Sequence, residues 1–356
     1  MYAARDGKGP FRARSQGRNG YHGLMDTLTH TSPSNDCTGV RQPVVGRFAP
    51  TPSGRIHLGN VFSALLAWAS VRAAGGKMIL RIEDLDPRAQ NQSVADELMR
   101  DYEWLGLSWD EGPFYQSRRT DAYHEALETL SGRGLTYPCF CSRAELHAAS
   151  APHASDGTFV YQGTCRGLTA EQIAEKSKTR NPAIRLMVPD ESSPLAQISV
   201  VDRVYGPYSE NLARDCGDFL IRRSDGIFAY QLAVVVDDGL MGVTEVVRGR
   251  DLLPSAARQT YLGDLLGFGR HEYAHVPLLM GPDGHRLSKR NLDTDVASLR
   301  EDGLSAKAII GWLAEAIGVA DQGERLTADE FANRFSWESV RTHKSDVVVD
   351  EKFFLK

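Results

Sequence analysis

The sequence VVGRFAPTPSGRIHLGN, residues 44–60, decides the fold of this chain. Its first seven residues are mostly apolar and predict a short buried strand. A turn rich in proline and glycine follows, and the apolar spacing from His57 to Ala73 predicts a helix that ends before Gly75. Residues 77–82 form a second apolar run. We therefore expect residues 44–84 to fold as a strand–helix–strand unit of the doubly wound α/β type.

The turn of this unit has the features of an anion-binding site. A helix that begins directly after a tight turn presents backbone N–H groups and a positive dipole end to a ligand. Gly54 and Gly59 allow a ligand to approach the backbone closely, and His57 adds a donor for phosphate oxygens. An ordinary strand–turn–helix corner is the alternative for a short HxGx string, but the longer string PTPSGRIHLGN is more specific.

A second run, RLSKR at residues 286–290, follows a turn-rich segment at 281–284. A lysine on such a loop, here Lys289, can reach triphosphate oxygens and stabilise the departure of pyrophosphate. Taken alone, the run is more typical of a solvated basic loop. The two runs together, in this order, favour nucleotide chemistry.

The rest of the chain alternates between predicted helices and strands. We expect helices at 93–109, 118–132, 255–267 and 303–318, and strands at 183–188, 198–201, 219–222, 231–236 and 244–248. This pattern predicts an α/β nucleotide-binding fold that carries an insertion and ends in a short helical tail. The expected parts are a disordered N-terminal tail (1–43), two catalytic halves (44–136 and 191–291), a cysteine-bearing insertion (137–190) and the helical tail (292–356).

The composition is that of an ordinary globular protein, with 356 residues, 42% apolar and 24% charged. A formal net charge of −5 is not typical of a nucleic-acid-binding domain, but local patches of Lys and Arg decide such binding. No apolar run is long enough to span a membrane, and the first residues contain no secretory apolar region. We expect a cytoplasmic protein without a membrane partner.

The two runs resemble the ATP-binding signatures of class I aminoacyl-tRNA synthetases, with HLGN similar to the HIGH motif and RLSKR similar to the KMSKS loop. Four runs look like glutamyl-tRNA synthetase, namely RFAPTPSG (47–54), RIEDLDPR (81–88), YQLAVVVDD (230–238) and VVRGRDLL (246–253). The resemblance covers residues 44–291. It implies a class I synthetase-type Rossmann (HUP-like) fold with ATP, Mg²⁺ and L-glutamate as ligands.

The resemblance also implies roles for individual residues. Arg47 and Arg248 would bind glutamate carboxylates through charge-assisted hydrogen bonds. Glu83 would accept from the substrate ammonium, and Tyr230 would add a hydrogen bond and a wall. The implied glutamate site also includes Phe48, Ala49, Pro50 and Thr51, and the implied ATP site consists of His57, Gly59, Asn60, Ser288 and Lys289, with His57 and Lys289 catalytic. The alternatives are a structural ion pair of Glu83 with Arg81 or Arg88, and a surface location for Arg248.

The cysteines suggest a metal site. The chain has five, and three of them, Cys139, Cys141 and Cys165, lie close together in sequence. A structural zinc ion takes four ligands, and His147, His153 or Tyr161 could supply the fourth. The pattern C-x-C…Y-x3-C resembles the zinc site of the glutamyl-queuosine branch of the family, which implies Tyr161. The alternative is a small core of reduced cysteines, and Cys37 and Cys216 are expected to be solitary.

The segment after Lys289 favours the same branch. A separate anticodon-binding domain would need roughly 100–150 residues, more than follow Lys289. The resemblance implies tRNA-independent activation of glutamate to glutamyl-adenylate, and transfer of glutamate to the queuosine base at the wobble position in the anticodon loop of tRNA(Asp). The alternatives are a short enzyme that charges the 3′ end of tRNA(Glu) and a non-catalytic tRNA-binding paralogue. We expect a monomer.

Overall fold

The computed structural model describes residues 43–142, 145, 160–285, 287 and 295–349. The N-terminal tail predicted at residues 1–43 therefore lies outside the described residues, except for Pro43. In the described part, no helix has the length and apolar character needed to cross a membrane.

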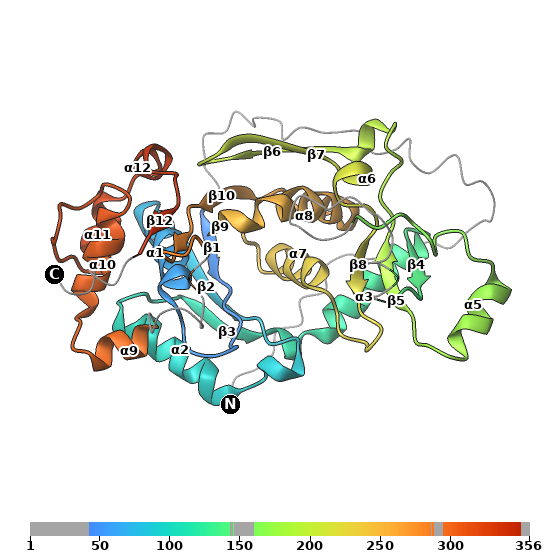
Figure 1. Cartoon of the computed structure of the whole chain (residues 1–356), viewed down its shortest axis with the longest axis horizontal. Helices are drawn as coiled ribbons and strands as arrows, with labels where there is room; N and C mark the ends of the chain where they lie inside the picture. The colour runs from blue at the N-terminus through green and yellow to red at the C-terminus, as the bar shows by residue number, and fades with distance from the viewer. Residues whose placement is uncertain (1–42, 143–144, 146–159, 286, 288–294, 350–356) are drawn as a thin grey trace. The chain divides into compact units, whose positions relative to one another are not determined.

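The predicted strand–helix–strand unit is confirmed. Strand β1 (Val45–Phe48), helix α1 (Leu58–Ala73) and strand β2 (Lys77–Ile82) follow one another, and the two strands pair in parallel. A third parallel strand, β3 (Glu111–Tyr115), pairs with the other edge of β2. Helix α2 (Gln92–Trp104) connects β2 to β3. Figure 1 shows α1 beside β1 and β2.

The second half of the fold contributes another sheet with the order β7-β6-β10-β9. Its strands are β6 (Gln197–Asp202), β7 (Gly206–Asn211), β9 (Glu245–Gly249) and β10 (Glu272–Val276). The sheets meet where the N–H of Thr244 donates to the carbonyl of Val45 at 2.9 Å. The side chain of Arg47 reaches the carbonyl of Val247 at 3.2 Å. Strands β1 and β9 thus run side by side, and their carboxyl ends share one edge, where ligands bind in open α/β folds.

The remaining elements surround these sheets. Helices α3 (Thr120–Gly132), α7 (Tyr230–Leu240) and α8 (Leu253–Leu266) share a core beside the second half. A small antiparallel sheet, β4 (Thr136–Cys139), β5 (Ala183–Leu186) and β8 (Phe219–Arg222), carries the cysteine segment together with α5 (Ala170–Ser177). A short helix, α6 (Leu212–Asp215), follows β7.

The C-terminal helices share the core of the first half. They are α9 (Val296–Glu301), α10 (Ala306–Glu315), α11 (Ala328–Arg334) and α12 (Trp337–Thr342), and they gather near α1 in Figure 1. Leu313 and Phe331 belong to the same buried cluster as Phe62 and Leu65 of α1. Strand β12 (Val347–Val348) pairs with β11 (Leu279–Met280) in parallel. The described residues 295–349 therefore pack against the first half of the fold.

Most of the predicted elements are confirmed, but one is wrong. The strands expected at 183–188, 198–201, 219–222 and 244–248 are present within two residues of their expected ends. Residues 231–236 were expected to be a strand and instead lie in helix α7. Residues 232–238 are all buried, and a fully buried apolar run has no periodicity that separates a helix from a strand. The described strands and α-helices that were not predicted individually are β3, β4, β7, β10, β11 and β12, and α5, α6, α9, α11 and α12.

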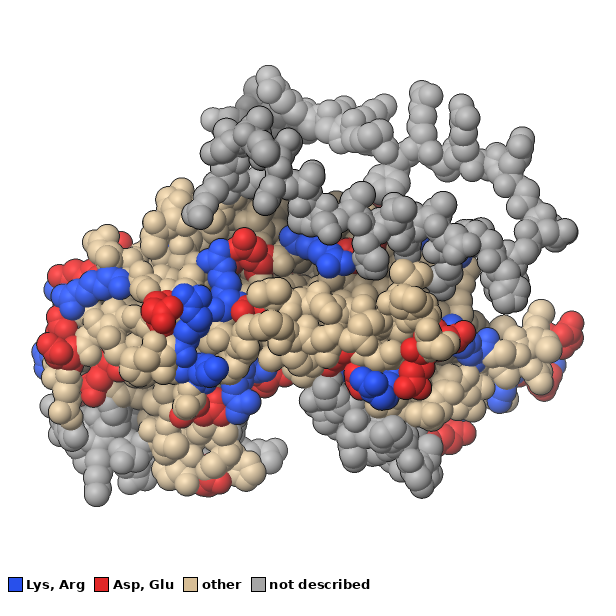
Figure 2. Space-filling model, turned by 90° about the horizontal axis from the view of Figure 1, so that it is seen from above, with Lys and Arg blue, Asp and Glu red and all other residues tan. Residues whose placement is uncertain are grey.

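Charged side chains of both signs are interspersed across the face seen in Figure 2, between broad areas of uncharged residues. This agrees with the mixed composition and the small net charge.

A buried ionic network joins the two halves of the fold. Arg81 of β2 has no exposed side-chain surface; its Nη1 lies 2.6 Å from Asp238 and its Nη2 3.1 Å from Glu83. Asp237 Oδ2 lies 3.7 Å from Arg81 Nε and also accepts a hydrogen bond from Tyr123 at 2.8 Å. Burial by itself lowers the pKa of Arg81, but the neighbouring carboxylates raise it above its ordinary value. The Arg81 guanidinium is thus charged, and the neighbouring carboxylates compensate its charge.

Replacement of this guanidinium is expected to destabilise the protein strongly. In Arg81→Met a side chain of similar length remains, but the carboxylates of Asp237 and Asp238 lose their shared buried cation. Removing one partner of a buried ion pair costs about 3–5 kcal/mol, so urea denaturation should show a loss of that size in the free energy of unfolding. Arg88→Met, at a side chain 84% exposed, is the control and should have no measurable effect. A loss no greater in Arg81→Met than in the control would contradict the compensating role.

Candidate active site

A pocket lies at the shared edge of β1 and β9. It has a volume of about 420 Å³ and is lined by the turn after β1, the first turns of α1, and the ends of β2 and β9. All the residues predicted for glutamate line it, namely Arg47, Phe48, Ala49, Pro50, Thr51, Glu83, Tyr230 and Arg248. The tertiary structure therefore brings together residues that lie about two hundred positions apart in sequence.

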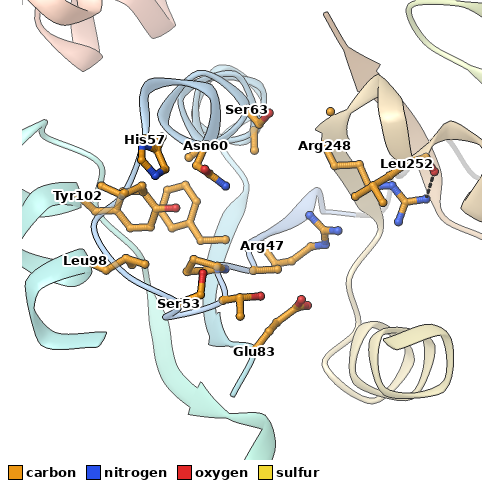
Figure 3. Close-up of a pocket in the computed structure, with 18 of the residues that line it drawn as sticks. Arg47, Ser53, His57, Asn60, Ser63, Glu83, Leu98, Tyr102, Arg248 and Leu252 are labelled. Carbon is orange, nitrogen blue, oxygen red and sulfur yellow. Dashed lines mark hydrogen bonds between the residues drawn. The ribbon is translucent and has the colours of Figure 1, made fainter. Parts of the chain in front are cut away.

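The nucleotide end of the pocket is the turn into α1. Gly54 has a φ of 138°, which favours glycine, and His57 is the N-cap residue of the helix. His57 and Asn60 line the pocket and are labelled beside it in Figure 3. Gly59 is outside the lining set, and a Cβ built on it would meet no atom within 4 Å. The first turn of a helix has N–H groups without intrahelical partners, so this corner suits an anion.

Aromatic side chains line the same end of the pocket, where Tyr102 lies beside His57 (Figure 3). The rings of Phe48 and Tyr102 stack with centroids 4.8 Å apart and an interplanar angle of 29°. Leu98 and Ala64 complete this apolar surface. The pocket thus combines a flat apolar wall with an anion-binding helix end.

Arg47 and Glu83 form the charged floor of the pocket (Figure 3). Arg47 is 6% exposed, and its Nε lies 3.6 Å from Asp238 Oδ1. Glu83 is bound by Arg81, so the structural ion pair considered above is present, yet Glu83 also lines the pocket. Arg88, the other partner considered for Glu83, binds Asp86. Burial raises the pKa of Glu83 above its ordinary value despite the opposing effect of Arg81 and Arg47.

Arg248 enters the pocket from the second half of the fold. A surface location for Arg248 is wrong, because the residue is only 5% exposed. Its Nη1 donates to Gln259 at 2.7 Å and to the Tyr230 hydroxyl at 3.5 Å, and its Nη2 donates to the carbonyl of Leu252 at 3.2 Å. Its Nε donates to His275 at 3.0 Å. Gln259 and His275 were missed by sequence reasoning; a histidine inside an apolar run, EYAHVPLL at 272–279, was the available signal.

The second nucleotide run, RLSKR, is only partly described. Arg286, Ser288 and Lys289 lie outside the described residues, while Leu287 is buried and its N–H donates to the carbonyl of Leu279 at 3.0 Å. On the far side of the run, the N–H of Val296 donates to the carbonyl of Ile56 at 3.0 Å. Arg55 also lies 3.5 Å from Asp295 and 3.6 Å from Glu97. Asp295 and Val296, which follow the run in sequence, thus contact Arg55 and Ile56 of the first motif.

The predicted metal cluster is assembled in the structure. The thiol sulfurs of Cys139, Cys141 and Cys165 all lie within 4.8 Å of one another. The Tyr161 hydroxyl lies 3.5 Å from the sulfur of Cys139 and 3.6 Å from that of Cys141. Sulfur ligands around a tetrahedral zinc ion lie about 3.8 Å apart. His147 and His153, the other candidate fourth ligands, lie outside the described residues.

Arg185 lies behind this cluster. Its Nε donates to the sulfur of Cys139 at 3.2 Å, and its guanidinium lies 3.6 Å from the centre of the Tyr161 ring. Burial raises the pKa of the Cys139 thiol, but its hydrogen bonds with Tyr161 and Arg185 outweigh burial and hold that pKa below its ordinary value. The three clustered sulfurs of Cys139, Cys141 and Cys165 could bind a metal ion.

Comparison with known proteins agrees with this geometry. The family described as "tRNA synthetases class I (E and Q), catalytic domain" matches residues 43–353. A glutamyl-Q tRNA(Asp) synthetase from Symbiobacterium thermophilum is 46% identical over 297 residues, covering 80% of this chain and 90% of the relative. A glutamyl-Q tRNA(Asp) synthetase from Nitratidesulfovibrio vulgaris is 47% identical over 284 residues, covering 77% of this chain and 86% of the relative.

Solved structures give the same assignment of the catalytic fold. A glutamate tRNA ligase from Elizabethkingia meningosepticum, in complex with its amino acid, superposes with a TM-score of 0.73 at 29% identity, covering 88% of this chain and 68% of that chain. The glutamate-tRNA synthetase from Elizabethkingia anophelis gives a TM-score of 0.74 at the same identity. The chain therefore belongs to the class I (E and Q) tRNA synthetases and, within them, to the family of glutamyl-Q tRNA(Asp) synthetases.

Proposed function

We propose that this protein activates L-glutamate with ATP, without tRNA, and transfers the glutamyl group to the queuosine base at the wobble position of tRNA(Asp). The observation that carries the proposal is the pocket in which Arg47, Arg248 and Glu83 converge beside the turn into α1. The names of the relatives support the acceptor. Because the acceptor is a tRNA, we place the reaction in the cytoplasm.

The first step joins glutamate to the nucleotide. A glutamate carboxylate oxygen attacks the α-phosphorus of ATP, the bond to pyrophosphate breaks, and glutamyl-adenylate forms. The two guanidinium groups of Arg47 and Arg248 match the two carboxylates of glutamate. Glu83 accepts from the ammonium, and Tyr230 closes the pocket beside Arg248. The carboxylate of Glu83 also discourages an anionic group at the ammonium position, so the charges orient the substrate.

The nucleotide is held by the two motif segments. The first turn of α1 and His57 donate to phosphate oxygens as negative charge moves to pyrophosphate. Asn60 and Gly59 border the same corner, and we assign Ser288 and Lys289 to the triphosphate from the resemblance alone. Mg²⁺ bound with ATP supplies compensation of the phosphate charge.

The second step transfers the glutamyl group. A hydroxyl of the cyclopentenediol ring of queuosine attacks the acyl carbon of glutamyl-adenylate, and AMP leaves. The alternative acceptor is the 3′ end of tRNA(Glu). The superposed structures, named a glutamate tRNA ligase and a glutamate-tRNA synthetase, favour this alternative.

We also propose that Cys139, Cys141, Tyr161 and Cys165 hold a structural zinc ion. Thiolates are preferred zinc ligands, and four ligands complete a structural site. The ion would fasten the C-x-C end of β4 to the segment at 161–165, which belongs to the same insertion (137–190) between the catalytic halves.

Arg47→Met is expected to weaken glutamate binding selectively. Loss of a charge-assisted hydrogen bond to a carboxylate should raise the KM for glutamate roughly 100-fold in ATP–pyrophosphate exchange without tRNA, while the KM for ATP stays unchanged. Arg270→Met, at an exposed arginine that is outside the pocket lining and paired with Asp264, is the control. Equal exchange with leucine in place of glutamate, or no exchange in the unaltered protein, would refute the proposed activation.

The acceptor is tested with labelled glutamate and tRNA(Asp) that contains or lacks queuosine. We expect label only on the queuosine-containing tRNA, and nuclease digestion should release it with the wobble nucleoside. Label on the terminal adenosine, or charging of tRNA(Glu), would instead establish the 3′-end reaction. Exchange activity with no transfer to either tRNA would contradict both acceptors.

Removal of a metal ligand is expected to release zinc. Purified Cys141→Ala should contain less than about 0.2 zinc per chain because a structural site needs its four ligands, and Tyr161→Phe should lose zinc to a chelator faster than the unaltered protein. Cys216→Ala, which removes a buried cysteine outside the cluster, should retain the ion. Full zinc content in both Cys141→Ala and Tyr161→Phe would refute the proposed zinc site.

A further inference from the structure

The Arg248 guanidinium is held by a chain of polar side chains that crosses the second sheet. Strand β9 carries Arg248, and its parallel partner in β10 at the same register is His275. The next strand, β6, ends at Asp202, whose carboxylate lies 2.7 Å from His275 Nδ1. His275 is fully buried and Asp202 is 2% exposed. The three side chains therefore form a hydrogen-bonded relay, Asp202–His275–Arg248, shielded from water.

The tautomer of His275 follows from its partners. A carboxylate only accepts, so Nδ1 of His275 must carry the proton that binds Asp202. Nε2 then has a free lone pair, and it accepts from Arg248 Nε at 3.0 Å. The opposite tautomer would place an N–H of His275 against an N–H of Arg248. Burial lowers the pKa of His275, and the positive charge of Arg248 lowers it further. Together they outweigh the opposing effect of Asp202, so the pKa stays below its ordinary value and the ring is neutral.

Asp202 is itself fixed by the backbone. Its Oδ2 also accepts from the N–H of His275, and its Oδ1 accepts from the N–H groups of Val204 and Tyr205, each at 2.9 Å. Val204 and Tyr205, which bind Oδ1, belong to the turn between β6 and β7. Burial opposes the ionisation of Asp202, but the hydrogen bond from His275 and those from the two amides hold its pKa below the ordinary value. The carboxylate is therefore an ionised and immobile end point of the relay.

Arg248 and Arg47 differ in the charge of their nearest neighbours. Arg47 has a carboxylate, Asp238, at 3.6 Å, so part of its charge is compensated before a substrate binds. Among the described residues, no carboxylate lies within 4.0 Å of the Arg248 guanidinium; a neutral imidazole stands between it and Asp202. Arg248 also lies over the Tyr273 ring, with 5.4 Å to the centroid. The guanidinium is thus oriented without being neutralised.

We propose that Asp202 and His275 are positioning residues that hold Arg248 in the orientation that receives a substrate carboxylate. This inference rests on the proposed activation of glutamate and names two further residues that this activation requires. A guanidinium fixed before binding loses less conformational freedom when the substrate arrives. The neutral spacer leaves its full charge for the anionic substrate.

Two substitutions at His275 separate this role from a purely structural one. In His275→Gln the amide oxygen takes the place of Nε2 and keeps an acceptor for Arg248. In His275→Asn the amide nitrogen takes the place of Nδ1, so the bond to Asp202 is kept and the acceptor for Arg248 is lost. We expect His275→Asn to raise the KM for glutamate about 10-fold or more in ATP–pyrophosphate exchange, and His275→Gln to raise it less than about 3-fold. The KM for ATP should not change in either variant.

Asp202→Asn gives an independent test through the tautomer. The asparagine amide donates to Nδ1 of His275, so the ring proton moves to Nε2. The Nε2–H group then faces the Nε–H group of Arg248, and the hydrogen bond between them is lost. We expect the same rise in the KM for glutamate as in His275→Asn, with thermal unfolding of all variants measured alongside.

The outcomes are distinct. A rise confined to glutamate in His275→Asn and Asp202→Asn supports the relay. Equal KM values for glutamate in His275→Asn and His275→Gln, whether changed or unchanged, would overturn it while the proposed function stands. Absence of glutamate-dependent exchange in the unaltered protein would refute the proposed function itself, and the relay with it.

Discussion

The buried guanidinium of Arg81 is the interaction on which the catalytic unit depends. It comes from β2 in the first half of the fold and binds carboxylates of α7 in the second half. In the described part of the chain, Arg81 is the one guanidinium that contacts all three of the carboxylates Glu83, Asp237 and Asp238, and breaking a buried ion pair is strongly destabilising. The same network borders the pocket, since Glu83 binds Arg81 and Arg47 lies near Asp238. The ion pairs that join the two halves of the fold therefore also set the charges of the pocket.

The pocket shows how a protein can keep cations ready for an anionic substrate. Arg47 faces a buried carboxylate, and Arg248 faces a neutral histidine. Both guanidinium groups are nearly fully buried, where charge interactions are stronger than in water. The cost of burying them is offset by backbone carbonyls, amide oxygens and the sheet itself. We propose that the two carboxylates of glutamate supply the negative charges that these two guanidinium groups lack, which an uncharged amino acid would not do.

Sequence reasoning identified the pocket through motifs but not through its supporting residues. Arg47 to Thr51, His57, Asn60, Glu83, Tyr230 and Arg248 were predicted and line the pocket, because each belongs to a run with recognisable chemistry. Gln259, His275 and Asp202 were not assigned to the site, because none of them belongs to such a run. The error at residues 231–236 has the same origin, since a fully buried run carries no periodic pattern. The metal cluster was predicted from spacing, and the resemblance supplied Tyr161.

The sequence by itself determined the strand–turn–helix unit, several of the longer elements after it, the class of ligand and the family. These depend on local features: apolar periodicity, turn residues and contiguous motifs. Only the tertiary structure decided that β9 lies beside β1, that the helices after residue 295 share the core of α1, and that Arg248 is held through His275 by Asp202. Such contacts join residues tens to hundreds of positions apart, and the register between strands, which no single segment encodes, places them together.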